Sequence, residues 1–171
     1  MAESKPTTRK PATRKPKTMI GWEEWCAFPD LGLPAIKAKV DTGAKTSCIH
    51  AFDIKPFTKD GARHVRFKIN PLQKNKKLII ECEAPLSDHR NVTSSNGERE
   101  KRYVIKTPLV IGEKKITAEV TLASRHKMTF RMLLGRDAIS KAKFTVDPVK
   151  SFLLGKKKTP ETLYPQQGEQ E

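Results

Sequence analysis

The most constraining feature of this chain is an acidic residue at the end of an apolar strand. Residues 35–40 alternate between apolar side chains and lysines, which predicts a half-buried β-strand, and Asp41-Thr42-Gly43 follows at once. A carboxylate in such a place is costly unless it is hydrogen-bonded, paired or used in chemistry. A glycine two residues later lets backbone N–H groups approach it. Because an ordinary turn aspartate fits the same three residues, they do not decide the matter alone.

A second apolar stretch strengthens the signal. Residues 130–134 predict a buried strand that ends at Gly135, and residues 137–143 predict a short helix after it. Further strands are predicted at residues 48–52, 63–70, 77–83, 101–105, 109–111, 116–122 and 144–146. Many short strands with one short helix predict an all-β barrel or sandwich.

The two stretches together resemble the retropepsin-like aspartic proteases. The likeness lies in Val-Asp-Thr-Gly-Ala at 40–44 and Leu-Leu-Gly-Arg-Asp-Ala-Ile at 133–139. Ile-Gly-Trp at 20–22 and the sequence of residues 34–44 are closer still to a bacterial branch called RimB, also labelled ATP-dependent zinc protease. The resemblance covers residues 19–150. It implies a retropepsin-like closed β-barrel or sandwich with one short C-terminal helix.

The resemblance also implies a catalytic role for Asp41. Aspartic-protease chemistry uses two carboxylates that share one proton, and this chain has a single Asp-Thr-Gly. We therefore expect a two-fold homodimer in which each copy supplies half of the site. Thr42 would hydrogen-bond across the dimer. Gly43 and Ala44 would present backbone groups to an extended substrate.

Other parts of the site follow from the same resemblance. Leu134, Gly135 and Arg136 would support the active loop from behind, and residues 86–103 are the candidate flap over the cleft. The viral enzymes have two acidic residues after the alanine, one of which pairs with the arginine, whereas this chain has Lys45 and Thr46. Arg136 must then find another partner, and Asp137, Glu23 and Glu24 remain open.

Basic residues near the expected cleft suggest an acidic substrate. The candidates for substrate binding are Lys45, His50, Arg90, Arg99 and Arg102. A solvated basic face explains the charges equally well. The RimB branch is linked to a ligase that adds a poly-glutamate tail to a small-subunit ribosomal protein, and the resemblance implies a peptidase that trims such tails.

The charge of the whole chain points to an anionic partner. The formal net charge is +15 over 171 residues. Residues 1–18 form a basic arm that we expect to be disordered, serving as a solubilising tail or as a contact to nucleic acid. Residues 19–154 would form the domain, and 155–171 a flexible tail.

Composition and motifs limit the remaining classes. No apolar run is long enough for a membrane span and no secretory signal is visible, so we expect a cytoplasmic protein that does not bind membranes. The sequence has neither a His-Glu-x-x-His nor a phosphate-binding Gly-rich motif, so we expect no metal and no cofactor. The alternative to a peptidase is a catalytically idle retropepsin scaffold that binds the ribosome, nucleic acid or an acidic protein.

Overall fold

The protein folds around a single large β-sheet. The computed structural model describes residues 17–93, 96–124 and 129–165. Its strands are β1 (Thr18–Ile20), β2 (Glu23–Phe28), β3 (Leu33–Asp41), β4 (Ser47–His50), β5 (Phe52–Lys59), β6 (Ala62–Ile69), β7 (Ile80–Thr93), β8 (Arg99–Ile111), β9 (Lys114–Ala123), β10 (Met132–Gly135) and β11 (Phe144–Val146). The helices are one α-helix, α1 (Arg136–Lys141), and the 3₁₀ turns η1 (Pro29–Leu31) and η2 (Pro160–Leu163).

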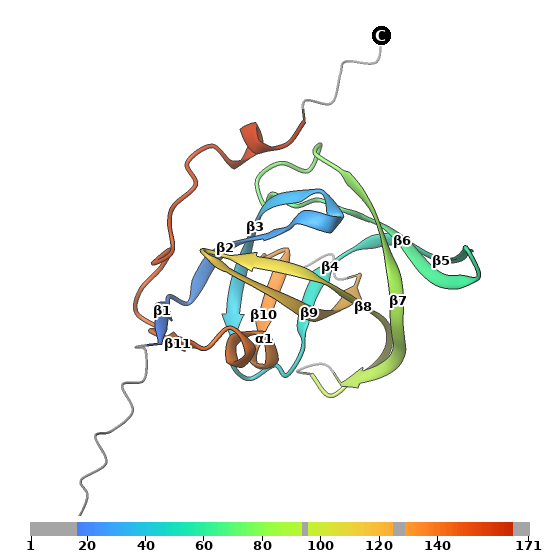
Figure 1. The fold of residues 1–171 in the computed structure, drawn as a ribbon, viewed down its shortest axis with the longest axis horizontal. Coiled ribbons are helices and arrows are strands. Elements are labelled where there is room, and N and C mark those ends of the chain that lie inside the picture. The colour runs from blue at the N-terminus through green and yellow to red at the C-terminus, as the bar shows by residue number, and fades with distance from the viewer. Residues whose placement is uncertain (1–16, 94–95, 125–128, 166–171) are drawn as a thin grey trace, which may run out of the picture.

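Nine strands form this sheet in the order β2-β3-β10-β4-β9-β8-β7-β6-β5. An additional pairing of β2 with β8, through Ala27 and Val110, closes six of them into a barrel. The strands β7, β6 and β5 extend the sheet beyond the barrel, to the right in Figure 1. The small sheet of β1 and β11 lies near α1. The all-β architecture expected from the sequence is confirmed.

The core follows from the alternation within the strands. Large apolar side chains from both halves of the chain are fully buried, among them Phe28, Ile36, Phe67, Ile105 and Leu134. Burying each such side chain contributes about 1.5–3 kcal/mol relative to leaving it exposed. This packing fixes the end of β3, which carries the Asp41-Thr42-Gly43 loop.

The observed elements differ from the expected ones mainly at their ends. The predicted strand at 48–52 is the end of β4 and the start of β5, separated by Ala51. The candidate flap at 86–103 falls on the long hairpin of β7 and β8, in which Arg90 lies opposite Arg102. Strand β2 was not predicted, because its alternation is carried by mixed aromatic and acidic residues that resemble no simple pattern.

The predicted tail, 155–171, lies partly within the described residues. There η2 forms, and Tyr164 is buried with its hydroxyl donating a hydrogen bond to the carbonyl oxygen of Ala35. The predicted arm lies almost wholly outside the described residues. None of the helices in the described part of the chain is long and apolar enough to cross a bilayer.

Candidate active site

The Asp-Thr-Gly loop leaves the barrel where two strands run side by side. Strands β3 and β10 are parallel neighbours, with Leu134 opposite Val40 and Gly135 opposite Asp41. Strand β4 pairs with the other edge of β10. The loop that joins β3 to β4 therefore starts and ends beside the same short strand, and the two stretches singled out in the sequence meet here.

The carboxylate of Asp41 is held by its own loop. Its Oδ1 accepts hydrogen bonds from the backbone N–H of Gly43 at 3.0 Å and of Ala44 at 3.2 Å. These two bonds fix the orientation of the carboxylate in the loop. The side chain is only partly buried, while Thr42 and Gly43 are exposed. No hydrogen bond to Oδ2 forms among the described residues.

The turn after β10 locks the loop from behind. The N–H groups of Arg136 and Asp137 donate to the carbonyl oxygens of Ala44 (2.7 Å) and Lys45 (3.0 Å). The N–H of Gly135 donates to Ser47 Oγ at 2.9 Å. These bonds join segments that are about ninety positions apart in the chain, so the strand and helix fix the shape of the active loop.

Gly135 is required by the closeness of this packing. A Cβ at this position would lie 2.5 Å from the carbonyl carbon of Thr46 and 2.7 Å from the nitrogen of Ser47. Both are backbone atoms, which cannot move without shifting the loop. The supporting role expected for Gly135 therefore has a direct steric cause.

Arg136 contacts the loop through a bond that the sequence did not predict. Its Nη1 donates to the carbonyl oxygen of Thr42 at 3.0 Å, and no ion pair among the described residues involves it. Among the three carboxylates left open for it, Glu24 is occupied elsewhere by backbone N–H groups. The guanidinium still ties helix to loop, without the acidic partner.

The cationic candidates for substrate binding have different surroundings. Lys45 and Arg99 are exposed. Arg90 pairs with Glu119 at 3.1 Å and with Asp88 at 3.5 Å. Lys45 lies in the loop between β3 and β4, whereas Arg90 and Arg99 lie on the β7–β8 hairpin, and the role of all three in binding stays a prediction.

Two further candidates are buried. His50 is 4% exposed on β4, and Arg102 is 6% exposed, with Nη1 against the Sγ of Cys48 at 3.8 Å and Nε on Glu100 at 3.2 Å. Direct contact with a substrate would require the residues that bury these side chains to move. Their assignment to substrate binding also stays a prediction.

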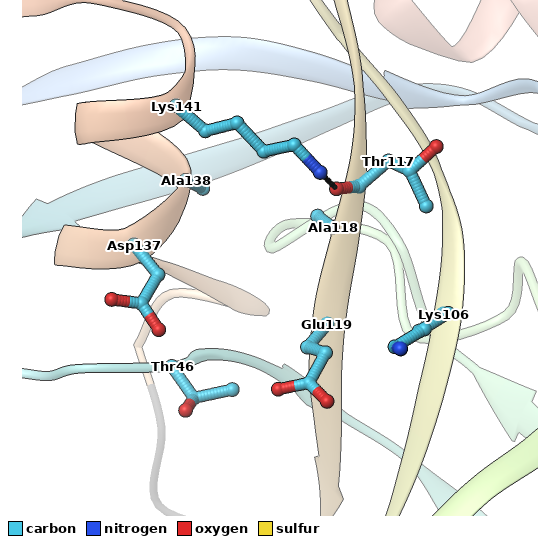
Figure 2. Close-up of a pocket in the computed structure, with 8 residues that line it drawn as sticks. All are labelled: Thr46, Lys106, Thr117, Ala118, Glu119, Asp137, Ala138 and Lys141. Carbon is cyan, nitrogen blue, oxygen red and sulfur yellow. Dashed lines mark hydrogen bonds between the residues drawn. The ribbon is translucent and has the colours of Figure 1, made fainter.

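A small pocket of about 270 Å³ lies beside the loop. Figure 2 shows Asp137 of α1 and Glu119 of β9 on either side of it, with Thr46 from the active loop below. Lys141 crosses from α1 and donates to the carbonyl oxygen of Thr117 at 2.7 Å. The pocket lies between α1 and the barrel strands β8 and β9, and its lining carries charges of both signs. Thr46 connects it to the Asp-Thr-Gly loop.

The histidines and cysteines of the described residues do not gather into a metal site. Within residues 17–93, 96–124 and 129–165, no three His, Cys, Asp or Glu side chains come together in a way that could hold an ion. The Sγ of Cys82 donates to the carbonyl oxygen of Leu31 at 3.3 Å, and the ring of His89 stacks on Tyr103. His126 lies outside the described residues. Burial raises the pKa of the Cys82 thiol to about 12, so this sulfur is held in its protonated form.

One contact in the site was missed from the sequence. Ser47 accepts the hydrogen bond from Gly135, and only the alignment of β4 beside β10 reveals it. The pairing joins residues 88 positions apart, which no local pattern encodes.

A closed β-barrel with an Asp-Thr-Gly loop braced by a strand, a glycine and a short helix defines the retropepsin-like class of folds. The model of the RimB-like family, described as retropepsin-like aspartic endopeptidase RimB, matches residues 19–157. The chain belongs to this family.

Curated relatives of the chain have a different name. A Shewanella pealeana protein named probable alpha-L-glutamate ligase is 53% identical over 141 residues, which are 82% of this chain and 31% of that protein. A Desulfotalea psychrophila protein of the same name is 47% identical over 139 residues, or 81% of this chain and 30% of that protein. The chain thus spans about a third of the length of the curated relatives it matches.

A solved structure resembles the chain along most of its length. It is a Legionella pneumophila protein of unknown function, 29% identical with a TM-score of 0.69, and the match covers 80% of this chain and 98% of that one. The same fold therefore exists as a protein of nearly this domain's size.

Proposed function

We propose that this protein is an aspartic peptidase that acts as a two-fold homodimer, with one Asp41 from each copy. The observation that carries the proposal is the carboxylate of Asp41, whose Oδ1 is fixed by two backbone N–H groups while Oδ2 is left open. The family supplies the general aspartic-protease-like fold. Because one chain holds one such loop, a second copy is the simplest source of the second carboxylate.

In this mechanism the two aspartates share one proton, because like charges close together cannot both ionise. The ionised carboxylate takes a proton from a bound water, whose oxygen attacks the carbonyl carbon of the peptide bond. The protonated carboxyl donates a hydrogen bond to the carbonyl oxygen. When the C–N bond breaks, the leaving nitrogen takes a proton from the dyad, and the dyad returns to its starting state.

The loop residues would position the reactants. The exposed Gly43 and the half-exposed Ala44 can lie along the backbone of an extended peptide, which would bind as an additional strand. Thr42 would hydrogen-bond to its counterpart across the two-fold axis. The bond from Arg136 to the carbonyl oxygen of Thr42 supports this by keeping the backbone of the loop in place.

We further propose that the substrate is an acidic, glutamate-rich tail, such as one attached to a ribosomal protein. The exposed cations Lys45 and Arg99 would attract such a tail. The relatives named glutamate ligase match this chain over only about a third of their length. We assign the ligase activity to the remaining two thirds of those relatives. The matched domain would have the reverse task of hydrolysis.

The test is mass spectrometry of a glutamate-tailed peptide incubated with the wild type, with Asp41→Asn and with Asp30→Asn. Asp30 is an exposed aspartate of η1, outside the Asp-Thr-Gly loop, and makes the matched control. We expect shortening by the wild type and by Asp30→Asn, and a loss of about 10²–10⁴-fold in Asp41→Asn because its carboxylate is the acid or base. Light scattering on the same samples should give a dimer.

Two outcomes would contradict the proposal. Shortening at an equal rate by Asp41→Asn would remove the aspartic mechanism. Inactivity of all three proteins in a stably monomeric state would favour the idle scaffold that binds an anionic partner.

A further inference from the structure

A second concave region lies away from the active loop. It is a groove of about 830 Å³ between β2 and β3, the turn at residues 71–75 and the segment at residues 151–161. Figure 1 shows the C-terminal segment running along the outside of the barrel after β11. We call this region the Trp25 groove. Its lining includes Trp25, Phe152, Gln73, Lys37, Lys74 and residues 156–158.

Two aromatic rings line the groove together. Trp25 of β2 and Phe152 stack with ring centroids 6.3 Å apart and planes inclined by 23°. Both side chains are partly exposed. The pair is therefore not part of the buried core, and its rings border the open space of the groove.

The backbone is strained to keep Phe152 in this place. Its φ is +54°, a left-handed conformation that is costly for a bulky residue and that persists only where surrounding contacts enforce it. Its N–H donates to the carbonyl oxygen of Glu23 at 3.0 Å, and the next two N–H groups donate to the carboxylate of Glu24. A glycine would make the same turn without strain, so the benzyl ring is the feature that the strain retains.

A buried amide donor beside the groove has no partner in the described part of the chain. The Nε2 of Gln73 is inaccessible to solvent and has no hydrogen-bond partner among the described residues. Buried amide groups are nearly always paired, because an unpaired one is expensive. A small movement of this side chain toward the groove would give a bound molecule a hydrogen-bond donor.

The charge of the groove is strongly positive. Lys37, Lys74 and the three lysines at 156–158 line it, whereas Glu161 is the one acidic residue in its lining. The lining therefore carries five positive charges against one negative, a formal balance of +4. Such a concave basic surface concentrates anions around it.

We propose that the Trp25 groove binds single-stranded nucleic acid. Lysines track phosphates, stacked aromatic side chains accept bases, and an amide donor reads a base edge; these elements together are typical of single-strand binding. An acidic peptide would use the lysines but leave the ring pair and the amide without a role. Lys37, the groove residue on β3, lies four residues before Asp41, which is about 13 Å at the rise of a strand. The groove is therefore separate from the Asp-Thr-Gly loop.

The first test measures the affinity of a fluorescently labelled ten-nucleotide oligouridine by anisotropy, using the full chain. The variant Lys156→Gln/Lys157→Gln/Lys158→Gln removes three charges from the groove. The control Lys55→Gln/Lys114→Gln/Lys115→Gln removes three exposed charges elsewhere, none of them in an ion pair among the described residues. We expect at least tenfold weaker binding for the groove variant. The slope of log K against log salt should become shallower by about 2, because single strands release about 0.7 ions for each neutralised phosphate.

The control triple should weaken binding by less than about threefold, since charges far apart are screened by salt. Equal weakening by both triples would overturn the proposal, because binding would then follow net charge alone. The terminal arm is present in every variant, so differences between variants report the groove.

The second test separates nucleic acid from acidic peptide. In a Trp22→Phe background the chain has one tryptophan, Trp25, whose fluorescence should be quenched by the oligonucleotide. Phe152→Leu should weaken binding at least fivefold with the salt slope unchanged, because stacking is lost and charge is not. Asp41→Asn should bind as the wild type does.

Melting curves confirm that each variant is folded before its affinity is compared. Absence of quenching would overturn the proposal. So would competition by a ten-residue oligoglutamate as effective as that by unlabelled oligouridine, which would make the groove a site for acidic protein.

Discussion

Among the carboxylates that accept backbone hydrogen bonds, Glu24 and Asp41 have opposite surroundings. Glu24 is fully buried, and both of its oxygens are used: Oε2 accepts from Gly21 and Leu153, and Oε1 accepts from Leu154. Asp41 is half-buried and uses one oxygen only. The same kind of bond therefore anchors the chain in one region and, in the other, orients the carboxylate that we propose as catalytic.

The difference suggests a criterion that separates a structural acid from the one that we propose as catalytic. A buried carboxylate is stable only when its lone pairs are filled, and Glu24 meets that condition by joining β2 to residues 153–154. Asp41 keeps an oxygen for a partner that the described residues do not supply. Completeness of hydrogen bonding, more than burial or charge, distinguishes the two.

Replacement of Glu24 by alanine should sharpen this comparison most. It leaves three N–H groups without an acceptor, each costing about 1–3 kcal/mol when buried, so we expect the free energy of unfolding to fall by about 3 kcal/mol or more. Asp41→Ala should cost less than about 1 kcal/mol, because water replaces the exposed bonds. Urea unfolding of the two variants measures the contrast.

Limited proteolysis adds a local readout to that experiment. Cleavage after residue 150 should accelerate in Glu24→Ala and stay unchanged in Asp41→Ala. Equal losses of stability in the two variants would show that the distinction between the two carboxylates is wrong.

The sequence predicted the Asp-Thr-Gly loop better than the contacts by which Glu24 anchors residues 153–154. Asp41-Thr42-Gly43 and the stretch before Gly135 are local patterns with a known meaning, and the structure brings them together. Glu24 was considered only as a partner for Arg136, because a glutamate in a mixed segment has no signature of burial. The N–H groups of Leu153 and Leu154 that donate to it lie 129 and 130 residues away, beyond the reach of any local pattern.

The same reason explains the other parts that the sequence did not predict. The barrel closes through Ala27 and Val110, and Tyr164 reaches Ala35 from the far end of the chain. Neither contact involves a turn signal or a periodic pattern. The alternation within strands predicts that a sheet forms, whereas the order of its strands depends on packing between distant segments.

Gly21 and Gly135 allow a second test, because each lets two backbone segments come into close contact. Gly21 lies in the region of Glu24, and Gly135 lies beside the Asp-Thr-Gly loop. A Cβ on Gly21 would lie 2.2 Å from the carbonyl oxygen of Lys150, and one on Gly135 would lie 2.5 Å from the backbone of Thr46. We expect Gly21→Ala and Gly135→Ala each to lower the free energy of unfolding by about 1–3 kcal/mol, since neither site can expand. Activity per folded molecule should fall only in Gly135→Ala.

Thermal melting and the peptide assay of the folded fraction measure both effects. A loss of specific activity in Gly21→Ala as large as in Gly135→Ala would mean that the anchor and the active loop are mechanically coupled. The comparison between the two regions would then have to be abandoned.

The smallest expected effect concerns Tyr164, which lies ten residues beyond Leu154 in the segment that Glu24 holds. Burial raises the pKa of its phenol above the ordinary value of 10.0, because the ionised form would lose its hydration. The folded state thus holds the proton more tightly than the unfolded state. The stability from this group is complete below pH 10.0 and is lost as the pH rises further.

We therefore expect Tyr164→Phe to cost about 1 kcal/mol at neutral pH, through loss of the bond to Ala35, and to flatten the decline of stability above pH 10.0. The matched control is Tyr103→Phe, the second tyrosine of the chain, whose ring is partly exposed. Urea unfolding at neutral pH and at steps above pH 10.0 measures both. The buried thiols of Cys26 and Cys82 also have raised pKa values, but they are present in every variant, so the difference between variants isolates the phenol. An alkaline decline as steep in Tyr164→Phe as in Tyr103→Phe would show that this end of the segment does not hold the barrel.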